Sequence, residues 1–243
     1  MAEALGTGIA LMMALMPSSG TEGRAAAAGP MCHVPAALPI PHVERPRHAG
    51  EVRRMAIGGY TLALSWTPQY CAGKGDRGGT QCDRRIGRFG FVLHGLWPEG
   101  RNGRSWPQYC APATILPRRI LSGHFCMMPS VQLMQHEWAK HGTCMARRPE
   151  DYFGRARSVY GRIAMPDMAA LARESRLTAG GLAGVFVRAN PGMRADMIRV
   201  QATGPGLLSE VWICLDTGFE PARCPAGKAG LSSSARISIR TAY

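Results

Sequence analysis

Alternating apolar and polar residues predict several β-strands. In residues 60–67 (YTLALSWT) the large apolar side chains fall at every second position, which is typical of a strand with one buried face. Residues 88–94 (RFGFVLH) repeat this alternation. Residues 211–215 (VWICL) form a continuous apolar run, as expected of a strand covered on both faces. We expect two further strands over residues 198–201 and 237–240.

The middle of the chain carries apolar residues at helical spacing. From Pro149 onwards, six of them recur at steps of one or three positions: Tyr152, Phe153, Ala156, Val159, Tyr160 and Ile163. Proline suits the first turn of a helix, so the sequence predicts a helix that begins there. We expect further helices over residues 166–171 and, despite three glycines, over residues 178–189. Strands and helices follow one another without a regular strand–helix–strand alternation, so the fold class is α+β.

Composition divides the chain into three parts. Residues 1–28 resemble a signal peptide, because residues 9–16 (IALMMALM) form an apolar run too short to span a bilayer and small residues that suit cleavage follow it. The stretch before the run carries Glu3 and no Lys or Arg, so an uncleaved leader remains the alternative. Residues 29–57 contain many prolines and predict an extended arm, and residues 58–243 form the main domain. Whether the arm packs on that domain or blocks a cleft stays open.

The charge balance points to polyanionic partners. The chain of 243 residues has 29 Lys and Arg against 16 Asp and Glu, a formal charge of +13. Such an excess favours nucleic acid or anionic surfaces, although a coding bias toward Arg is an equally simple cause. Hydrophobic residues make up 46% and charged residues 19% of the chain, which excludes wholesale disorder. After the leader, no stretch is long and apolar enough to cross a membrane.

The cysteines indicate an oxidising compartment. Eight cysteines lie after the leader, and none forms a C-x-x-C pair, which argues against a zinc ribbon or a dithiol redox site. An even set of eight permits four disulfides in an exported protein. Short separations favour Cys71–Cys82 and Cys214–Cys224, and the sequence alone leaves the other pairings open. We therefore expect the protein in the periplasm or outside the cell.

Two short segments carry the candidate chemistry. The first, residues 91–100 (FVLHGLWPEG), places His94 at the expected end of a strand, before Gly95. A histidine in that place alone is more often structural than catalytic. The second, residues 136–144 (HEWAKHGTC), predicts a helix that Gly142 ends.

Four ionisable side chains share one side of that second helix. At about 100° per residue they span an arc of about 140°: His136, Glu137, Lys140 and His141. His141 lies in the expected last turn, where the helix dipole favours an imidazolium. The alternative to a functional site is that these four side chains form a polar helix face that only contacts solvent.

A zinc site is the second alternative for this helix. His136 and Glu137 resemble the start of an H-E-x-x-H motif, but the next histidine, His141, follows after five residues instead of four. The two imidazoles then diverge by about 140°, and Lys140 would place a cation beside the metal. We therefore expect no metal and no cofactor.

Two histidines, a lysine and a glutamate suit the cleavage of RNA by its own 2′-hydroxyl. That reaction needs a base for the hydroxyl, an acid for the leaving 5′-oxygen and cations for the phosphorane. One neutral and one protonated imidazole supply the first two. Lys140 supplies a cation.

Both segments resemble the two signature segments of the ribonuclease T2 family. Further similarities follow in the same order along the chain: residues 60–71 (YTLALSWTPQYC), Gln81-Cys82, Trp106-Pro107 with Cys110, Tyr152-Phe153, residues 212–214 and Cys224-Pro225. The resemblance covers residues 58–243 and implies an antiparallel sheet flanked by helices. It implies that His141 is the base and His94 the acid. It also implies that Glu137 and Lys140 stabilise the pentacovalent phosphorus and that His136 helps to hold the phosphate.

The resemblance also extends to disulfides and to base recognition. It implies the pairs Cys110–Cys144, Cys214–Cys224 and Cys71–Cys82, and elimination leaves Cys32 with Cys126. In the family, residues that follow the histidine of the first segment contact a base. Here Trp97 is the candidate stacking platform, Glu99 a candidate edge contact, and Trp106 a further candidate. Packing in the core is an equal alternative for Trp97.

The sequence thus predicts an endoribonuclease of low base specificity that acts on single-stranded RNA. The expected products are a 2′,3′-cyclic phosphate and then a 3′-phosphate. We expect a monomer without stable membrane association or a protein partner. The alternative is a non-catalytic RNA-binding or signalling protein on the same scaffold.

Overall fold

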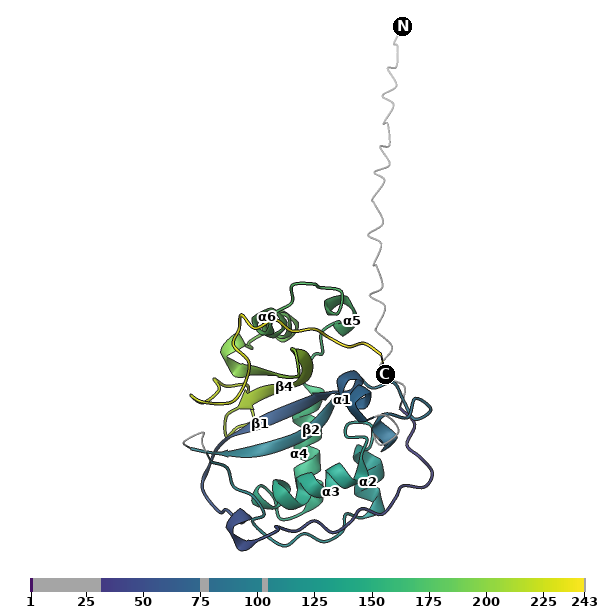
Figure 1. Ribbon diagram of the computed structural model, residues 1–243, viewed down its shortest axis with the longest axis vertical. Coiled ribbons are helices and arrows are strands. Elements are labelled where there is room, and N and C mark those ends of the chain that lie inside the picture. The colour runs from purple at the N-terminus through teal and green to yellow at the C-terminus, as the bar shows by residue number, and fades with distance from the viewer. Residues whose placement is uncertain (2–31, 75–78, 102–104, 243) are drawn as a thin grey trace.

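The computed structural model describes residues 1, 32–74, 79–101 and 105–242 (Figure 1). The expected signal peptide therefore lies outside the described residues, apart from Met1. Among the described residues, no helix is long and apolar enough to cross a membrane.

A four-stranded sheet forms the centre of the molecule. Its strands are β1 (Ile57–Trp66), β2 (Phe91–Gly100), β3 (Ile198–Thr203) and β4 (Leu207–Leu215), in the order β2-β1-β4-β3. All three pairs of neighbours are antiparallel. With the helices around it, the sheet confirms the α+β fold class. The expected strand over residues 237–240 is wrong, because within this range only Ser238 makes an isolated bridge, to Leu207.

In the part of the chain that the structure describes, six α-helices surround the sheet. They are α1 (Thr67–Lys74), α2 (Arg118–His124), α3 (Val131–Lys140), α4 (Pro149–Gly161), α5 (Met168–Leu171) and α6 (Ala179–Ala189). In Figure 1, α2 and α3 lie beyond β2, while α5 and α6 lie at the opposite end of the sheet, beyond β4. The short 3-10 helices are η1 (Ala49–Glu51), η3 (Gly142–Cys144) and η4 (Ala195–Met197).

The helix starts follow local chemistry. Pro149 begins α4, as its position in the sequence predicts. The side chains of Ser130 and Thr178 accept hydrogen bonds from the first turns of α3 and α6, which satisfies backbone donors that would otherwise lack a partner. Asp167 caps α5 in the same way, so this helix begins two residues after the expected Pro166.

One face of the sheet builds the hydrophobic core. Leu62, Leu64, Val211 and Ile213 have no exposed surface, and the strand register places them opposite one another on a single face. Phe186 from α6 closes over this face and meets the strand residue Phe91 edge to face. Full burial of a side chain of this size contributes about 1.5–3 kcal/mol each. The other face is left for polar and aromatic residues.

Four disulfides brace the chain, and they are the four pairs expected from the sequence: Cys32–Cys126, Cys71–Cys82, Cys110–Cys144 and Cys214–Cys224. The first of them ties the start of the arm to the segment between α2 and α3.

The arm packs on the domain along its described length. The backbone amide of His42 donates to Gln132 on α3, and Arg53 forms a β-bridge with Gln108. The arm therefore reaches the neighbourhood of the candidate site.

Candidate active site

A β-bulge in β2 sets the direction of the residues in the first signature segment. Leu93 pairs with Leu64 and Gly95 pairs with Ala63, so His94 is the extra residue between two neighbouring pairs. Without this bulge, Trp97 would share the core face with Leu93, because side chains alternate along a strand. The expectation that His94 ends a strand is therefore wrong: the strand continues to Gly100.

The bulge gathers the site on one face of the sheet. Trp97 lies opposite Thr61 in β1, and Trp212 lies opposite Ala63. Glu210 pairs with Ser65 on the same face. The polar residues of β2 and β4 thus lie together on the face that the core does not use.

Gly95 lets helix α3 approach the strand closely. A Cβ at this position would overlap the carboxylate of Glu137 and the indole nitrogen of Trp97. These two groups make a 2.8 Å hydrogen bond, in which Trp97 Nε1 donates to Glu137 Oε2. Only a glycine permits this contact without displacing one of its partners.

Helix α3 presents the second signature segment to the same place. Its last residue is Lys140, and His141 is the C-cap, whose backbone amide donates to the carbonyl of Glu137. The 3-10 helix η3 begins at Gly142, where a Cβ would overlap the Trp138 ring. His141 therefore lies just beyond the helix instead of in its last turn.

A pocket of about 610 Å³ collects all eight residues that the sequence singled out for catalysis or base binding. They are His94, Trp97, Glu99, Trp106, His136, Glu137, Lys140 and His141. Trp212, Gly227, Lys228 and Ala229 complete the lining. Two segments far apart in sequence thus meet in one cavity.

His94 is held by a carboxylate that the sequence did not single out. Its Nδ1 lies 2.6 Å from Glu210 Oε1, and Trp212 Nε1 donates to the other oxygen of Glu210 at 2.6 Å. His94 Nε2 lies 3.8 Å from Glu137 Oε1. Burial lowers the pKa of His94, but the Glu210 hydrogen bond and the charges of Glu137 and Glu210 outweigh it, so the pKa is raised above 6.5.

His141 has the opposite environment. It is 6% exposed, and its Nδ1 is buried without a hydrogen-bond partner in the described part of the chain. Burial, reinforced by the positive charges of Lys140 and His136, holds the pKa of His141 well below 6.5. The expectation that the helix dipole favours an imidazolium here is wrong, because burial favours the neutral ring.

Glu137 lies between the two histidine-bearing segments and is 1% exposed. Burial raises the pKa of its carboxyl, while His94, His136, the Trp97 hydrogen bond and Lys140 act in the other direction. Burial outweighs these groups, so the pKa of the Glu137 carboxyl is raised above its ordinary value.

Trp97 is the centre of the aromatic contacts. Its ring lies 5.1 Å from the His94 ring, 5.7 Å from the His141 ring and 5.4 Å from the Trp212 ring, measured between centroids. With its bond to Glu137, this placement orients the ionisable groups of both segments. Trp106, by contrast, is 41% exposed at the pocket and carries the Arg53 guanidinium over its ring.

The arm supplies a second carboxylate that the sequence did not reveal. Glu44 Oε1 lies 3.1 Å from His136 Nδ1 and accepts a hydrogen bond from the Tyr109 hydroxyl at 3.5 Å. Glu44 and Glu210 approach their histidines from 92 and 116 residues away. No local motif marks such contacts, since they arise only when the chain has folded.

The ionisable side chains are not arranged as a metal centre. Within the described ranges, no group of three His, Cys, Asp or Glu side chains is placed to hold a metal ion. Glu137 instead has Trp97 and His94 as neighbours.

Comparisons with known proteins show what the chain is similar to. The sequence model described as the Ribonuclease T2 family matches residues 57–224. The chain is 37% identical over 166 residues to a protein of Aeromonas hydrophila named "Ribonuclease", which covers 65% of this chain and 71% of that protein. It is 27% identical over 193 residues to a "Probable ribonuclease" of Haemophilus influenzae, covering 75% of this chain and 66% of the relative. The fold is similar to that of trichomaglin, described as an S-like ribonuclease, with a TM-score of 0.60, 18% identity and coverage of 75% and 97%.

Proposed function

Because the chain belongs to the ribonuclease T2 family, we propose that it is an endoribonuclease that cleaves single-stranded RNA with low base specificity. The 2′-hydroxyl attacks the adjacent phosphorus, the bond to the 5′-oxygen breaks, and a 2′,3′-cyclic phosphate forms. Water then opens the cyclic phosphate to a 3′-phosphate. Neither step requires a metal or a cofactor.

One observation carries this proposal: two histidines line one pocket with pKa values displaced in opposite directions. At neutral pH His141 is neutral and can take the proton of the 2′-hydroxyl. The raised pKa of His94 favours its protonated form, which can give its proton to the leaving 5′-oxygen. General acid–base catalysis of this kind contributes about 10²–10⁴-fold for each group.

The remaining ionisable residues are assigned to the phosphate. Lys140 supplies a positive charge to the phosphorane, where negative charge develops. His136, which Glu44 orients through Nδ1, binds a phosphate oxygen. Glu137 lies within 3.8 Å of His94 and stabilises the protonated form of the acid, in addition to polarising the phosphoryl group.

The proposed setting is the periplasm or the outside of the cell, reached by a signal peptide over residues 1–28. Four disulfides support it, because disulfides persist in oxidising compartments. The proposed working unit is a monomer with RNA as its partner.

Cleavage of a defined RNA in EDTA tests the function. We expect full activity with the chelator, no cleavage of DNA, and cyclic-phosphate ends in the mass spectrum of early products. His94→Ala and His141→Ala should each lower kcat by about 10²-fold or more while RNA affinity and thermal unfolding change little. Activity that disappears in EDTA would contradict the mechanism. Wild-type protein that binds RNA without cutting it would favour the non-catalytic alternative.

A further inference from the structure

A half-buried arginine of the arm lies over one wall of the pocket. The Arg53 guanidinium carbon is 4.8 Å from the centre of the Trp106 ring, and its Nε donates to the Trp106 carbonyl at 3.0 Å. Trp106 lines the cavity that holds His94 and His141. Arg53 precedes the family match, which begins at residue 57, so no signature segment accounts for this contact.

Backbone hydrogen bonds hold Arg53 in this place. Arg53 and Gln108 exchange two of them, each of 3.0 Å. The Gln108 side chain also accepts from Trp106 Nε1 at 2.9 Å and donates to the Glu51 carbonyl at 2.7 Å. The guanidinium and the indole are therefore in place before a substrate arrives, so little conformational freedom is lost on binding.

Arg53 lies on the side of the pocket that His141 occupies. Tyr109 follows the backbone partner of Arg53 in sequence and donates its amide to the Lys140 carbonyl at 2.8 Å. His141 is the residue after Lys140. Burial is the largest cause of the lowered pKa of His141, and the Arg53 guanidinium is one of the positive charges that add to it. The guanidinium therefore approaches the two histidines from the side of the proposed base.

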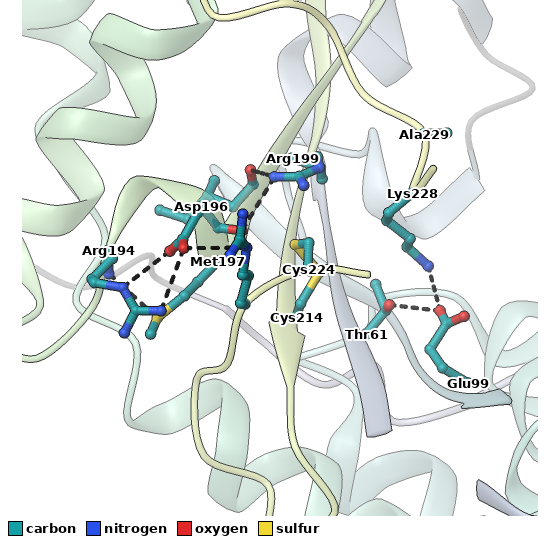
Figure 2. Close-up of a disulfide and its surroundings, with 12 residues drawn as sticks. Thr61, Glu99, Arg194, Asp196, Met197, Arg199, Cys214, Cys224, Lys228 and Ala229 are labelled. Atoms are coloured by element: carbon teal, nitrogen blue, oxygen red, sulfur yellow. Dashed lines mark hydrogen bonds and ion pairs between the residues drawn. A yellow bond between two sulfur atoms is a disulfide. The ribbon is translucent and has the colours of Figure 1, made fainter. Parts of the chain in front are cut away.

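Two of the three guanidinium nitrogens keep their hydrogen-bonding capacity. Within the described residues, the Arg53 side chain donates through Nε alone. Lys228, another basic side chain from outside the family match, instead has a carboxylate partner: Figure 2 shows its ammonium directed at Glu99, which also accepts from Thr61. A planar guanidinium that stacks on an aromatic ring still presents donors at its edge, and these match two oxygens of a phosphate.

We propose that Arg53 binds the RNA phosphate one nucleotide upstream of the phosphate that reacts. This inference rests on the proposed function and deepens it. The base takes its proton from the 2′-hydroxyl, which belongs to the nucleoside on the 5′ side of the reactive phosphate. His141 therefore marks the side of the pocket where this nucleoside lies. The same nucleoside carries the upstream phosphate on its 5′-oxygen, and Arg53 reaches that side with two unused nitrogens.

A contact of this kind aligns the strand without reading its sequence. Phosphate contacts fix the register of a nucleic acid and carry no direct information about the base, which suits broad cleavage of RNA. The contact lies between an exposed ion pair and a buried hydrogen bond to a charged group in strength, so we expect it to raise kcat/KM by about 5–10-fold.

The test compares one dinucleotide in three forms. Uridine is followed by deoxyuridine, so only the first sugar has a 2′-hydroxyl and only one bond can be cleaved. The dinucleotide is offered without a terminal phosphate, with a 5′-phosphate or with a 3′-phosphate. For wild-type protein, the 5′-phosphate should raise kcat/KM by about 5–10-fold, and the 3′-phosphate should have little effect. Arg53→Met should remove the gain from the 5′-phosphate.

Arg54→Met is the matched control. It removes the same charge one residue further along the arm, where the guanidinium donates through Nε to the Cys110 carbonyl at 2.9 Å, and it should keep the gain. A second variant covers the case in which Arg53→Met fails to fold because the Trp106 carbonyl loses its donor. Arg53→Gln removes the charge but retains an N–H donor, and it should also lose the gain.

Four results would overturn the inference. They are a wild-type protein that gains nothing from the 5′-phosphate, a gain that the 3′-phosphate gives instead, a gain that persists in a folded Arg53 variant, and a gain that Arg54→Met loses equally. The last of these would show general attraction to a basic surface. Wild-type protein that cuts neither these dinucleotides nor longer RNA would instead refute the proposed function.

Discussion

At the scale of the residue, the environment makes two chemically identical side chains different. His94 and His141 both start from a reference pKa near 6.5. Glu210 and Glu137 surround the first with negative charge, whereas burial and Lys140 act on the second. The sequence identified both histidines, because they lie in two recognisable segments. It did not identify Glu210, because that contact joins positions 116 residues apart.

Glu210→Gln tests how His94 is held in its protonated form. Removing the carboxylate charge should lower the pKa of His94, so a smaller fraction stays protonated as the pH rises. The alkaline limb of the kcat/KM profile should therefore move to lower pH, while the acidic limb, which His141 sets, should stay in place. The measurement is kcat/KM against pH between about 4 and 9.

Glu220→Gln is the matched control, since Glu220 pairs with Arg162 on the surface. It should leave both limbs unchanged. An alkaline limb that does not move in Glu210→Gln would show that Glu210 has only a structural role.

At the scale of the element, regular periodicity was predictable and irregularity was not. The helices α3, α4 and α6 follow from apolar spacing and capping residues. The short helices α1 and α2 carry no such repeat and were not expected. The bulge at His94 leaves a trace in the sequence, because Leu93 and Leu96 are separated by three positions. Both are fully buried, and they pair with the core residues Leu64 and Leu62. A regular strand cannot place such a pair on one face.

Gly95→Ala tests the close approach between β2 and α3. The added methyl would overlap Glu137 and the Trp97 indole, and displacement of an active-site group by about 1 Å costs about 10²-fold in rate. We expect kcat to fall by that order while the circular dichroism spectrum stays unchanged.

Gly154→Ala is the control for the added methyl. Gly154 lies within α4, and a Cβ there would meet no atom within 4 Å. This variant should keep full activity and gain up to about 1 kcal/mol of stability, because alanine favours a helix interior. Activity of Gly95→Ala close to that of wild type would contradict the role given to the close approach at Gly95.

At the scale of the whole molecule, segments outside the family match contact residues that line the pocket. The arm contributes Glu44 at His136, and the segment after Cys224 contributes Lys228 at Glu99. The sequence correctly predicted an α+β fold, but it left open whether the arm packs on the domain. That question depends on contacts between distant parts of the chain, which local patterns do not encode. The structure shows an arm that forms part of the site.

The opposite protonation of His94 and His141 is measured most directly by a histidine NMR titration of the wild-type protein. His94→Ala and His141→Ala assign the two imidazole signals. We expect the His141 signal to titrate well below pH 6.5 and the His94 signal above it, so that between these values one ring is neutral and the other charged. A reversed order, or two rings that titrate together near pH 6.5, would contradict the assignment of base and acid.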